Sequence, residues 1–269
     1  MCSEATISQR ILRAKLTIAE KGLEYVTPER SELRERVVST LAVVYALFNE
    51  GHTGRTGPLM RLDLQSESLR LGRLLGELLP NEAEVFGLTA MIAFSVARAA
   101  ERVDDKGVPI LLAKQVRSRW DKALLREGLL ELQRARSLRG RGPYVLQAEI
   151  SAYHVTAPTW ESTDWNAILC LYDELLEQTG SPIVALNRAI AVSMCHGPEY
   201  GLRELAALGP LLVDYHLLYA TRADFLDRAG RDPLPDLQKA LSLVTNDGER
   251  RLLQQRYELV TRRASDQER

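Results

Sequence analysis

Polar, amide and basic side chains follow one another closely near the start of the chain. Apolar residues recur there every three or four positions, so a helix would turn them to one inward face. They are Ile7, Ile11, Ala14 and Ile18. The side chains that fall outside this face and could point outward are Ser8, Gln9, Leu12 and Arg13. Amide and short polar groups can contact base edges in the DNA major groove, and arginine can contact guanine or phosphate. The segment therefore predicts a DNA recognition helix or, more simply, a basic amphipathic helix packed on the rest of the fold.

A second set of polar residues occurs among the apolar positions of helices expected later in the chain. Its members are Asn49, Glu50, Gln147, Asn187 and Arg188. Because buried polar groups need hydrogen-bond partners, these side chains must either satisfy one another or line a groove. The sequence leaves open a structural network and a polar groove for a ligand or peptide. Two roles are also open for the tryptophans, which could anchor a partner or fill the contacts between helices. They are Trp120, Trp160 and Trp165.

Residues that could catalyse a reaction or hold a metal are scattered along the chain. The histidines are His52, His154, His196 and His216. None has a nucleophile or carboxylate at a spacing typical of acid–base chemistry, so we interpret them as structural residues with satisfied hydrogen bonds. The three cysteines form no Cys-x-x-Cys pair, and no glycine-rich phosphate loop occurs. Glu67 and Arg70, three positions apart, predict an ion pair between helical side chains. We expect no enzymatic activity, no metal and no cofactor.

The overall charge excludes a strong general attraction to nucleic acids. The 269 residues include 35 lysines and arginines and 36 aspartates and glutamates, which gives a net charge of −1. A local excess of about two positive charges occurs in residues 1–21. The longest uncharged runs, 37–49 and 85–97, are shorter than the roughly 18 residues that a membrane-spanning helix needs. Without an apolar signal segment either, the sequence predicts a cytoplasmic protein with no membrane partner.

The elements that must position these residues are helices. Leucine and alanine recur at helical spacing and β-branched runs are short, which predicts an all-α helical array of about twelve helices. After the first helix, the expected helices cover 30–48, 60–79, 81–99 and 118–138, with one short β-hairpin at 103–111. Later helices are shorter and come in pairs, at 144–155, 164–178, 183–194, 199–208, 214–229, 234–244 and 247–263. A shift of 33 residues places Gly197 on Gly230, a partial match typical of degenerate tetratricopeptide-like (TPR-like) helix pairs.

Several motifs resemble, in order, those of one protein family. The run from Ser3 to Lys15 is similar to the recognition helix in region four of extracytoplasmic-function (ECF) RNA polymerase sigma factors, where a serine- and arginine-rich stretch ends in Arg-Ala-Arg or Arg-Ala-Lys. Later motifs resemble the sigma-factor subgroup with a long C-terminal TPR-like extension. They are Phe48 to Gly51, Arg117 to Asp121, Gly142 to Ala148, Thr163 to Trp165, Leu171 to Asp173 and Ala185 to Ala189. The resemblance covers essentially the whole chain.

This resemblance implies a role in transcription initiation. The positions that would face the −35 promoter element are Ser8, Gln9, Leu12 and Arg13. Arg10 and Lys15 match positions that contact phosphates or pack beside the DNA-contacting residues. The implied partners of the intact protein are promoter DNA and the RNA polymerase core. The extension would govern sigma activity within the same polypeptide, by contacting the other sigma regions or the polymerase.

Departures from the family pattern limit what this chain could do by itself. Sigma region two and most of region four have no counterpart, so we expect an N-terminally truncated factor that does not initiate transcription alone. Residues 114–116 replace an acidic pattern of the family. The expected parts are a recognition-helix remnant with its linker at 1–27, a helical extension at 28–140 and a TPR-like part at 141–269. The alternative function is a free-standing TPR-like scaffold that binds a peptide.

Overall fold

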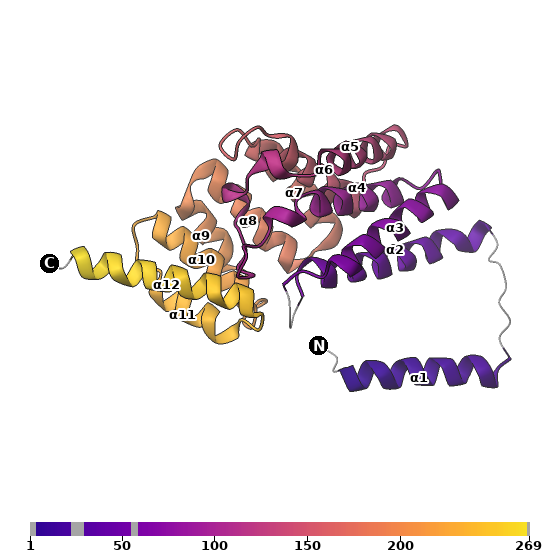
Figure 1. Ribbon diagram of the computed structural model, residues 1–269, viewed down its shortest axis with the longest axis horizontal. Coiled ribbons are helices and arrows are strands. Elements are labelled where there is room, and N and C mark those ends of the chain that lie inside the picture. Colours follow the sequence, from indigo (N-terminus) through magenta and orange to yellow (C-terminus); the bar gives the residue numbers. More distant parts are fainter. Residues whose placement is uncertain (1–3, 23–29, 55–58, 268–269) are drawn as a thin grey trace. The chain divides into compact units, whose positions relative to one another are not determined.

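A computed structural model describes residues 4–22, 30–54 and 59–267 of the chain (Figure 1). Over these ranges it contains twelve α-helices and no β-strand, so the predicted all-α helical array is confirmed. The chain divides into two compact units, residues 1–40 and 41–269. The first contains α1 (Glu4–Glu20) and the beginning of α2 (Arg30–His52), and the second contains the rest of α2 and all later helices. Every helix within the described ranges is too short or too polar to cross a lipid bilayer.

Helix α4 (Ala83–Ala97) organises the packing in the second unit. All its residues from Val85 to Ser95 are buried, as expected for a helix that is apolar on every side. It packs against α3 (Leu62–Leu78), α5 (Lys122–Ser137) and α6 (Pro143–Thr156). Helix α6 approaches α4 tightly at Gly87, where an added Cβ would lie 2.6 Å from the backbone nitrogen of Val145. A glycine is therefore required here to bring the two helices together.

The remaining helices pack mainly on their neighbours in sequence. They are α7 (Trp165–Thr179), α8 (Pro182–His196), α9 (Pro198–Ala206), α10 (His216–Arg228), α11 (Leu234–Leu243) and α12 (Asp247–Gln267). Pro143, Pro182 and Pro198 each stand in the first turn of a helix, where a missing N–H removes no hydrogen bond. Gly180 ends α7 in the left-handed conformation, with φ of 57°. These local signals explain why the predicted bounds agree with the observed ones to within a few residues.

The segment between α4 and α5 differs from the prediction. The expected β-hairpin is reduced to a single antiparallel bridge between Val103 and Pro109. The backbone N–H of Asp104 donates to Val108 O over 2.9 Å, and that of Ile110 donates to Arg102 O over 2.8 Å. Because Pro109 has no N–H, it cannot extend the ladder. Short 3-10 helices at Ala99–Glu101, Leu112–Lys114 and Arg117–Arg119 complete the segment.

Candidate functional site

The residues expected to contact DNA all lie on α1, and all are exposed. They are Ser8, Gln9, Arg10, Leu12, Arg13 and Lys15. The apolar residues of the same helix are exposed as well, with accessible fractions of 52% for Ile11 and 51% for Ile18. Ala14 is also exposed, and the side chain of Ile7 lies outside the described residues. Within the first unit, α1 is a solvated helix, and the inward packing expected for its apolar face is not observed.

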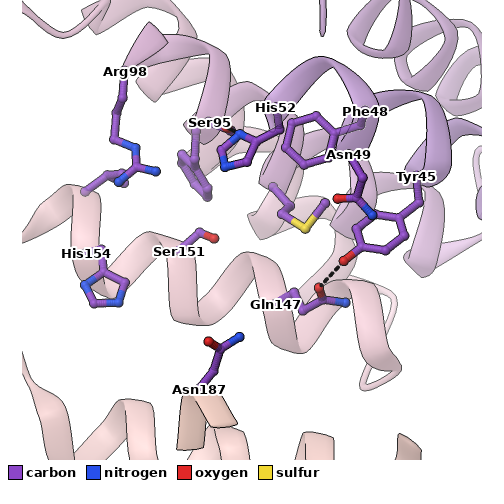
Figure 2. A pocket seen from close by; sticks show the side chains of 13 residues that line it. Tyr45, Phe48, Asn49, His52, Ser95, Arg98, Gln147, Ser151, His154 and Asn187 are labelled. Atoms are coloured by element: carbon purple, nitrogen blue, oxygen red, sulfur yellow. Dashed lines mark hydrogen bonds between the residues drawn. The ribbon is translucent and has the colours of Figure 1, made fainter. Parts of the chain in front are cut away.

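A polar groove lies between α2, α4, α6 and α8 in the second unit (Figure 2). It consists of two adjoining cavities of about 320 Å³ and 490 Å³. The residues that line both cavities are Tyr45, Asn49, Met91, Gln147, Ser151 and Asn187. Because these residues come from four helices that are distant in sequence, the groove exists only where the helices pack together. We refer to the two cavities together as the polar groove.

The side chains in the middle of the polar groove are amides and hydroxyls. The Tyr45 hydroxyl donates to Gln147 Oε1 over 3.2 Å, and Gln147 Nε2 donates to a backbone carbonyl one turn earlier over 3.0 Å. Among the residues that the structure describes, the side chains of Asn49, Ser151 and Asn187 have no hydrogen-bond partner. These three side chains are therefore free to bind a polar molecule in the groove.

Three of the five polar residues singled out from the sequence, Asn49, Gln147 and Asn187, thus meet in one place. The other two do not join them. Glu50 is exposed on α2 and lines neither cavity. Arg188 forms ion pairs with Asp173 and Glu204, each over 2.6 Å. Adjacent residues on one helix point in different directions, which explains why sequence neighbours of a groove residue need not belong to the groove.

A histidine network forms one wall of the polar groove. His52 Nδ1 lies 2.7 Å from Ser95 Oγ and 2.8 Å from Arg102 Nη1, and Arg102 Nη1 also donates to the His52 carbonyl over 2.7 Å. Since a guanidinium can only donate, His52 Nδ1 accepts, and the ring proton is assigned to Nε2. Burial, together with the positive charges of Arg102 and Arg98, lowers the pKa of His52 well below its usual value. His52 is therefore a neutral hydrogen-bonding group at physiological pH.

Arg98 and His154 face one end of the groove from α4 and α6, while Tyr45, Asn49 and Gln147 lie at the other (Figure 2). No carboxylate and no hydrogen-bond acceptor within the described ranges pairs with Arg98. Burial and the neighbouring Arg117 lower the Arg98 pKa to about 10. Even so, the guanidinium keeps its charge near neutral pH. This end of the groove thus holds a largely desolvated cation without a counter-ion.

Arg117 and Trp120 pack behind this end of the groove. Arg117 Nη1 donates to the carbonyl oxygens of His154 and Ala157, over 2.6 and 2.9 Å. The Arg117 guanidinium lies 4.8 Å from the centre of the Trp120 ring, and the Arg98 guanidinium lies 6.0 Å from it. Burial, Arg98 and Arg117 lower the pKa of His154 to about 4, so its ring is neutral. These contacts hold two arginines near one another around a buried indole.

His154 corrects one interpretation of the sequence. Its ring packs against Trp160 and Trp165, with centroid distances of 6.2 and 5.2 Å, as a structural histidine would. Its Nδ1 atom, however, is buried without a hydrogen-bond partner, so the expectation of a satisfied residue is wrong. Arg98 was not predicted from the sequence at all. The one signal that could have found it is its place directly after the uncharged run 85–97, where the end of a buried helix carries a cation into the protein interior.

The side chains of the groove can bind a polar molecule. His52 Nδ1 contacts the Ser95 hydroxyl, and neither His52 nor His154 is hydrogen-bonded to a carboxylate in the described part of the chain. The same ranges contain no group of three or more metal-binding side chains. What the groove offers is a cation, neutral imidazoles and free amides, which together can hold a molecule with oxygen acceptors and a negative charge.

Comparison with known proteins gives a match to a family model and to a curated relative. Residues 36–136, from α2 through most of α5, match a family described as a family of unknown function (DUF6596). An uncharacterized protein of Rhizobium meliloti (strain 1021) is 38% identical over 252 residues. The match covers 93% of this chain and 60% of that relative. The chain therefore spans about three fifths of the length of the curated relative that it matches.

Proposed function

We propose that this chain is the C-terminal regulatory extension of an ECF-type RNA polymerase sigma factor, and that α1 is the promoter-contacting helix of region four. The observation that carries the proposal is that α1 is one continuous helix exposing all six residues expected to contact DNA. The ordered motifs along the rest of the chain support the same family. A relative of which this chain covers only 60% is long enough to contain further regions.

The geometry of α1 supports contact with the major groove. Successive residues of an α-helix are rotated by about 100°, so Gln9 and Arg13 fall nearly opposite the apolar side of the helix. Ser8 and Leu12 adjoin them on the same broad face. Amide and guanidinium groups can form paired hydrogen bonds with base edges, and an apolar side chain can contact a thymine methyl group. This face of α1 would read bases, while Arg10 and Lys15 would contact the DNA backbone.

The helical array would act as the regulatory part of the factor. Its helices pack mainly on their neighbours in sequence, and such stacked helices present extended surfaces to partners. In the intact factor we expect these surfaces to contact the sigma regions or the polymerase core. Promoter affinity would depend on those contacts too, because the first turns of the chain carry an excess of only about two positive charges.

The same sequential packing favours a second candidate, a free-standing helical scaffold that binds a peptide. In that case the exposed face of α1 would have no role at a promoter. The polar groove would then be the centre of the peptide-binding surface. The two candidates therefore make opposite predictions about transcription.

A run-off transcription assay with RNA polymerase core decides between the two candidates. A polypeptide that joins this chain to sigma region two and the rest of region four should give promoter-specific transcripts. We expect none from the 269-residue chain alone, because none of its motifs resembles the polymerase-binding and promoter-melting regions of the family. Transcripts from the chain alone would contradict the proposal, and a joined polypeptide without any promoter-specific transcripts would favour the scaffold.

A further inference from the structure

We propose that the polar groove is a binding site for a small polar molecule that carries a carboxylate or phosphate group, and that this group pairs with Arg98. The site belongs wholly to the second unit and does not depend on the promoter role of α1. Binding at the groove and binding to promoter DNA can therefore succeed or fail separately. A molecule bound there would give the extension a chemical signal to respond to.

Several buried N–H donors without acceptors lie together at the charged end of the groove. Arg98 Nε, Arg117 Nη2 and Trp120 Nε1 are each buried and unpaired among the described residues. The three side chains contact one another through the Trp120 ring. Leaving buried donors unsatisfied is unfavourable, and native structures seldom gather several of them in one place. An oxyanion beside Arg98 would accept hydrogen bonds at this point.

No carboxylate among the described residues forms an ion pair with Arg98. Three acidic residues approach the cationic region, and each acts on another group. The Glu101 carboxylate accepts from the Val116 N–H over 3.2 Å and from Arg119 over 3.3 Å. The charge of Glu249 acts on Arg102, and that of Glu161 acts on Arg117. Arg98 thus remains the cation available to a ligand at this end of the groove.

A second cavity of the molecule is lined by arginines that form ion pairs, and it provides a comparison with Arg98. It lies between α3 and α5 and has a volume of about 590 Å³, which is larger than either part of the polar groove. Its arginines are already paired, Arg73 with Glu127 over 2.6 Å and Arg134 with Glu131 over 2.9 Å. A ligand there would have to displace an existing partner. The polar groove is therefore the better anion site although it is smaller.

Size and composition indicate a small molecule as the ligand. Cavities of about 320 and 490 Å³ fall within the range that small ligands occupy in proteins. The free side chains of Asn49, Ser151 and Asn187 continue from the charged end along the groove. They can donate and accept hydrogen bonds, so the part of the ligand beyond the anionic group should carry hydroxyl, amide or similar groups.

The tryptophans of the chain are placed so that their intrinsic fluorescence can report binding. All three of its tryptophans lie around the charged end: Trp120 beside Arg98 and Arg117, and Trp160 and Trp165 against His154. An anion that pairs with Arg98 should change the intrinsic tryptophan fluorescence. The experiment titrates the full chain with sodium phosphate and, separately, with sodium acetate, at constant ionic strength. Acetamide, which has the shape of acetate but no charge, is the matched neutral probe.

We expect a saturable fluorescence change with phosphate, acetate or both, in a range on the order of millimolar because these probes make only a few contacts. Which probe binds tells whether the ligand carries a phosphate or a carboxylate. Acetamide should give no saturable change. The Arg98→Met substitution should weaken binding at least about tenfold, because it removes the charged donor. Arg134→Met removes an exposed arginine outside the groove and should leave the titration unchanged.

Thermal unfolding separates this role from a structural one. Without an anion, Arg98→Met should unfold at the same temperature as the unsubstituted chain or at a higher one, because no hydrogen bond or ion pair is lost and a largely desolvated charge without a counter-ion is removed. If this variant fails to fold, Arg98→Gln, which keeps an N–H donor but no charge, is titrated instead by the same criterion. The proposal is overturned if neither phosphate nor acetate gives a saturable change, if acetamide gives the same change, or if the uncharged variant binds as well as the unsubstituted chain.

Discussion

Helix α1 and the polar groove both carry unpaired polar side chains, but only in the groove does this have an energetic consequence. Arg13 on α1 is exposed, so water satisfies its hydrogen bonds and no partner is needed. Arg98 in the groove is largely removed from water and has neither a carboxylate nor an acceptor within the described ranges. An unpaired exposed group therefore says little about a ligand, whereas an unpaired buried group indicates one. DNA binding by α1 is therefore inferred from residue type, whereas ligand binding in the groove is inferred from burial.

The largest expected difference is in stability: a substitution in the packed second unit should lower the free energy of unfolding far more than one on α1. Gly87→Val places a side chain against the Val145 backbone, so α4 and α6 must separate. We expect the free energy of unfolding to fall by about 3 kcal/mol, the upper part of the range for overpacked cores. Leu12→Ala on the exposed face of α1 should change it by less than about 0.5 kcal/mol. Urea unfolding followed by circular dichroism measures both, and equal stabilities would contradict the packing described for α4.

The second difference concerns DNA. In a protein that joins this chain to the remaining sigma regions, Arg13→Ala should weaken promoter binding by about 1–3 kcal/mol, or roughly 5- to 150-fold, as expected for an arginine that contacts a base. The exposed control Arg134→Ala on α5 should bind as the unsubstituted protein does. Gel-shift titrations at fixed salt provide the measurement. Unchanged binding by Arg13→Ala would remove this residue from the promoter contact.

A third difference is sensitivity to pH. Helix α1 contains no histidine, whereas the groove contains His52 and His154, whose pKa values are lowered on folding. The unfolded chain therefore binds more protons than the folded one below about pH 6.5, so stability is present above that pH and is lost as the pH falls. With the His154 pKa at about 4, lowering the pH from 7.5 to 5.5 should remove about 1 kcal/mol through this residue.

Unfolding of His154→Asn at the same two pH values tests this assignment. The variant should lose less stability on acidification than the unsubstituted chain. His196→Asn, which changes an exposed histidine, serves as the control. A pH dependence that is identical in the His154 variant and the unsubstituted chain would show that His154 titrates normally in the folded protein.

The smallest expected effect concerns Arg188, which the sequence grouped with the groove residues. Its pairs with Asp173 and Glu204 are partly exposed, so Arg188→Ala should lower the free energy of unfolding by no more than about 1 kcal/mol. The same substitution should leave the phosphate and acetate titrations unchanged. If Arg188→Ala instead abolished anion binding, Arg188 would belong to the binding site, which would then extend beyond the two cavities.

Particular residues show why parts of the fold could be predicted and others could not. Pro182 and Gly197 bracket α8, and the prediction of a helix at 183–194 agrees with the observed Pro182–His196 because such signals act on the local backbone. The hairpin prediction failed because Pro109, an apparent strand residue, cannot donate to a ladder. Asn49, Gln147 and Asn187 could be recognised as polar residues in apolar helices, but their meeting in one groove could not be deduced from spacing.

The sequence by itself determined the all-α class, most helix bounds and the composition of α1, because helical periodicity and terminal residues act over a few positions. Only the tertiary structure decided which polar residues meet. The close approach of α4 and α6 at Gly87 brings Arg98 and His154 to the same groove, and packing removes most of each side chain from water. Desolvation depends on everything that surrounds a side chain, so no local pattern could reveal that Arg98 Nε is buried without a partner among the described residues.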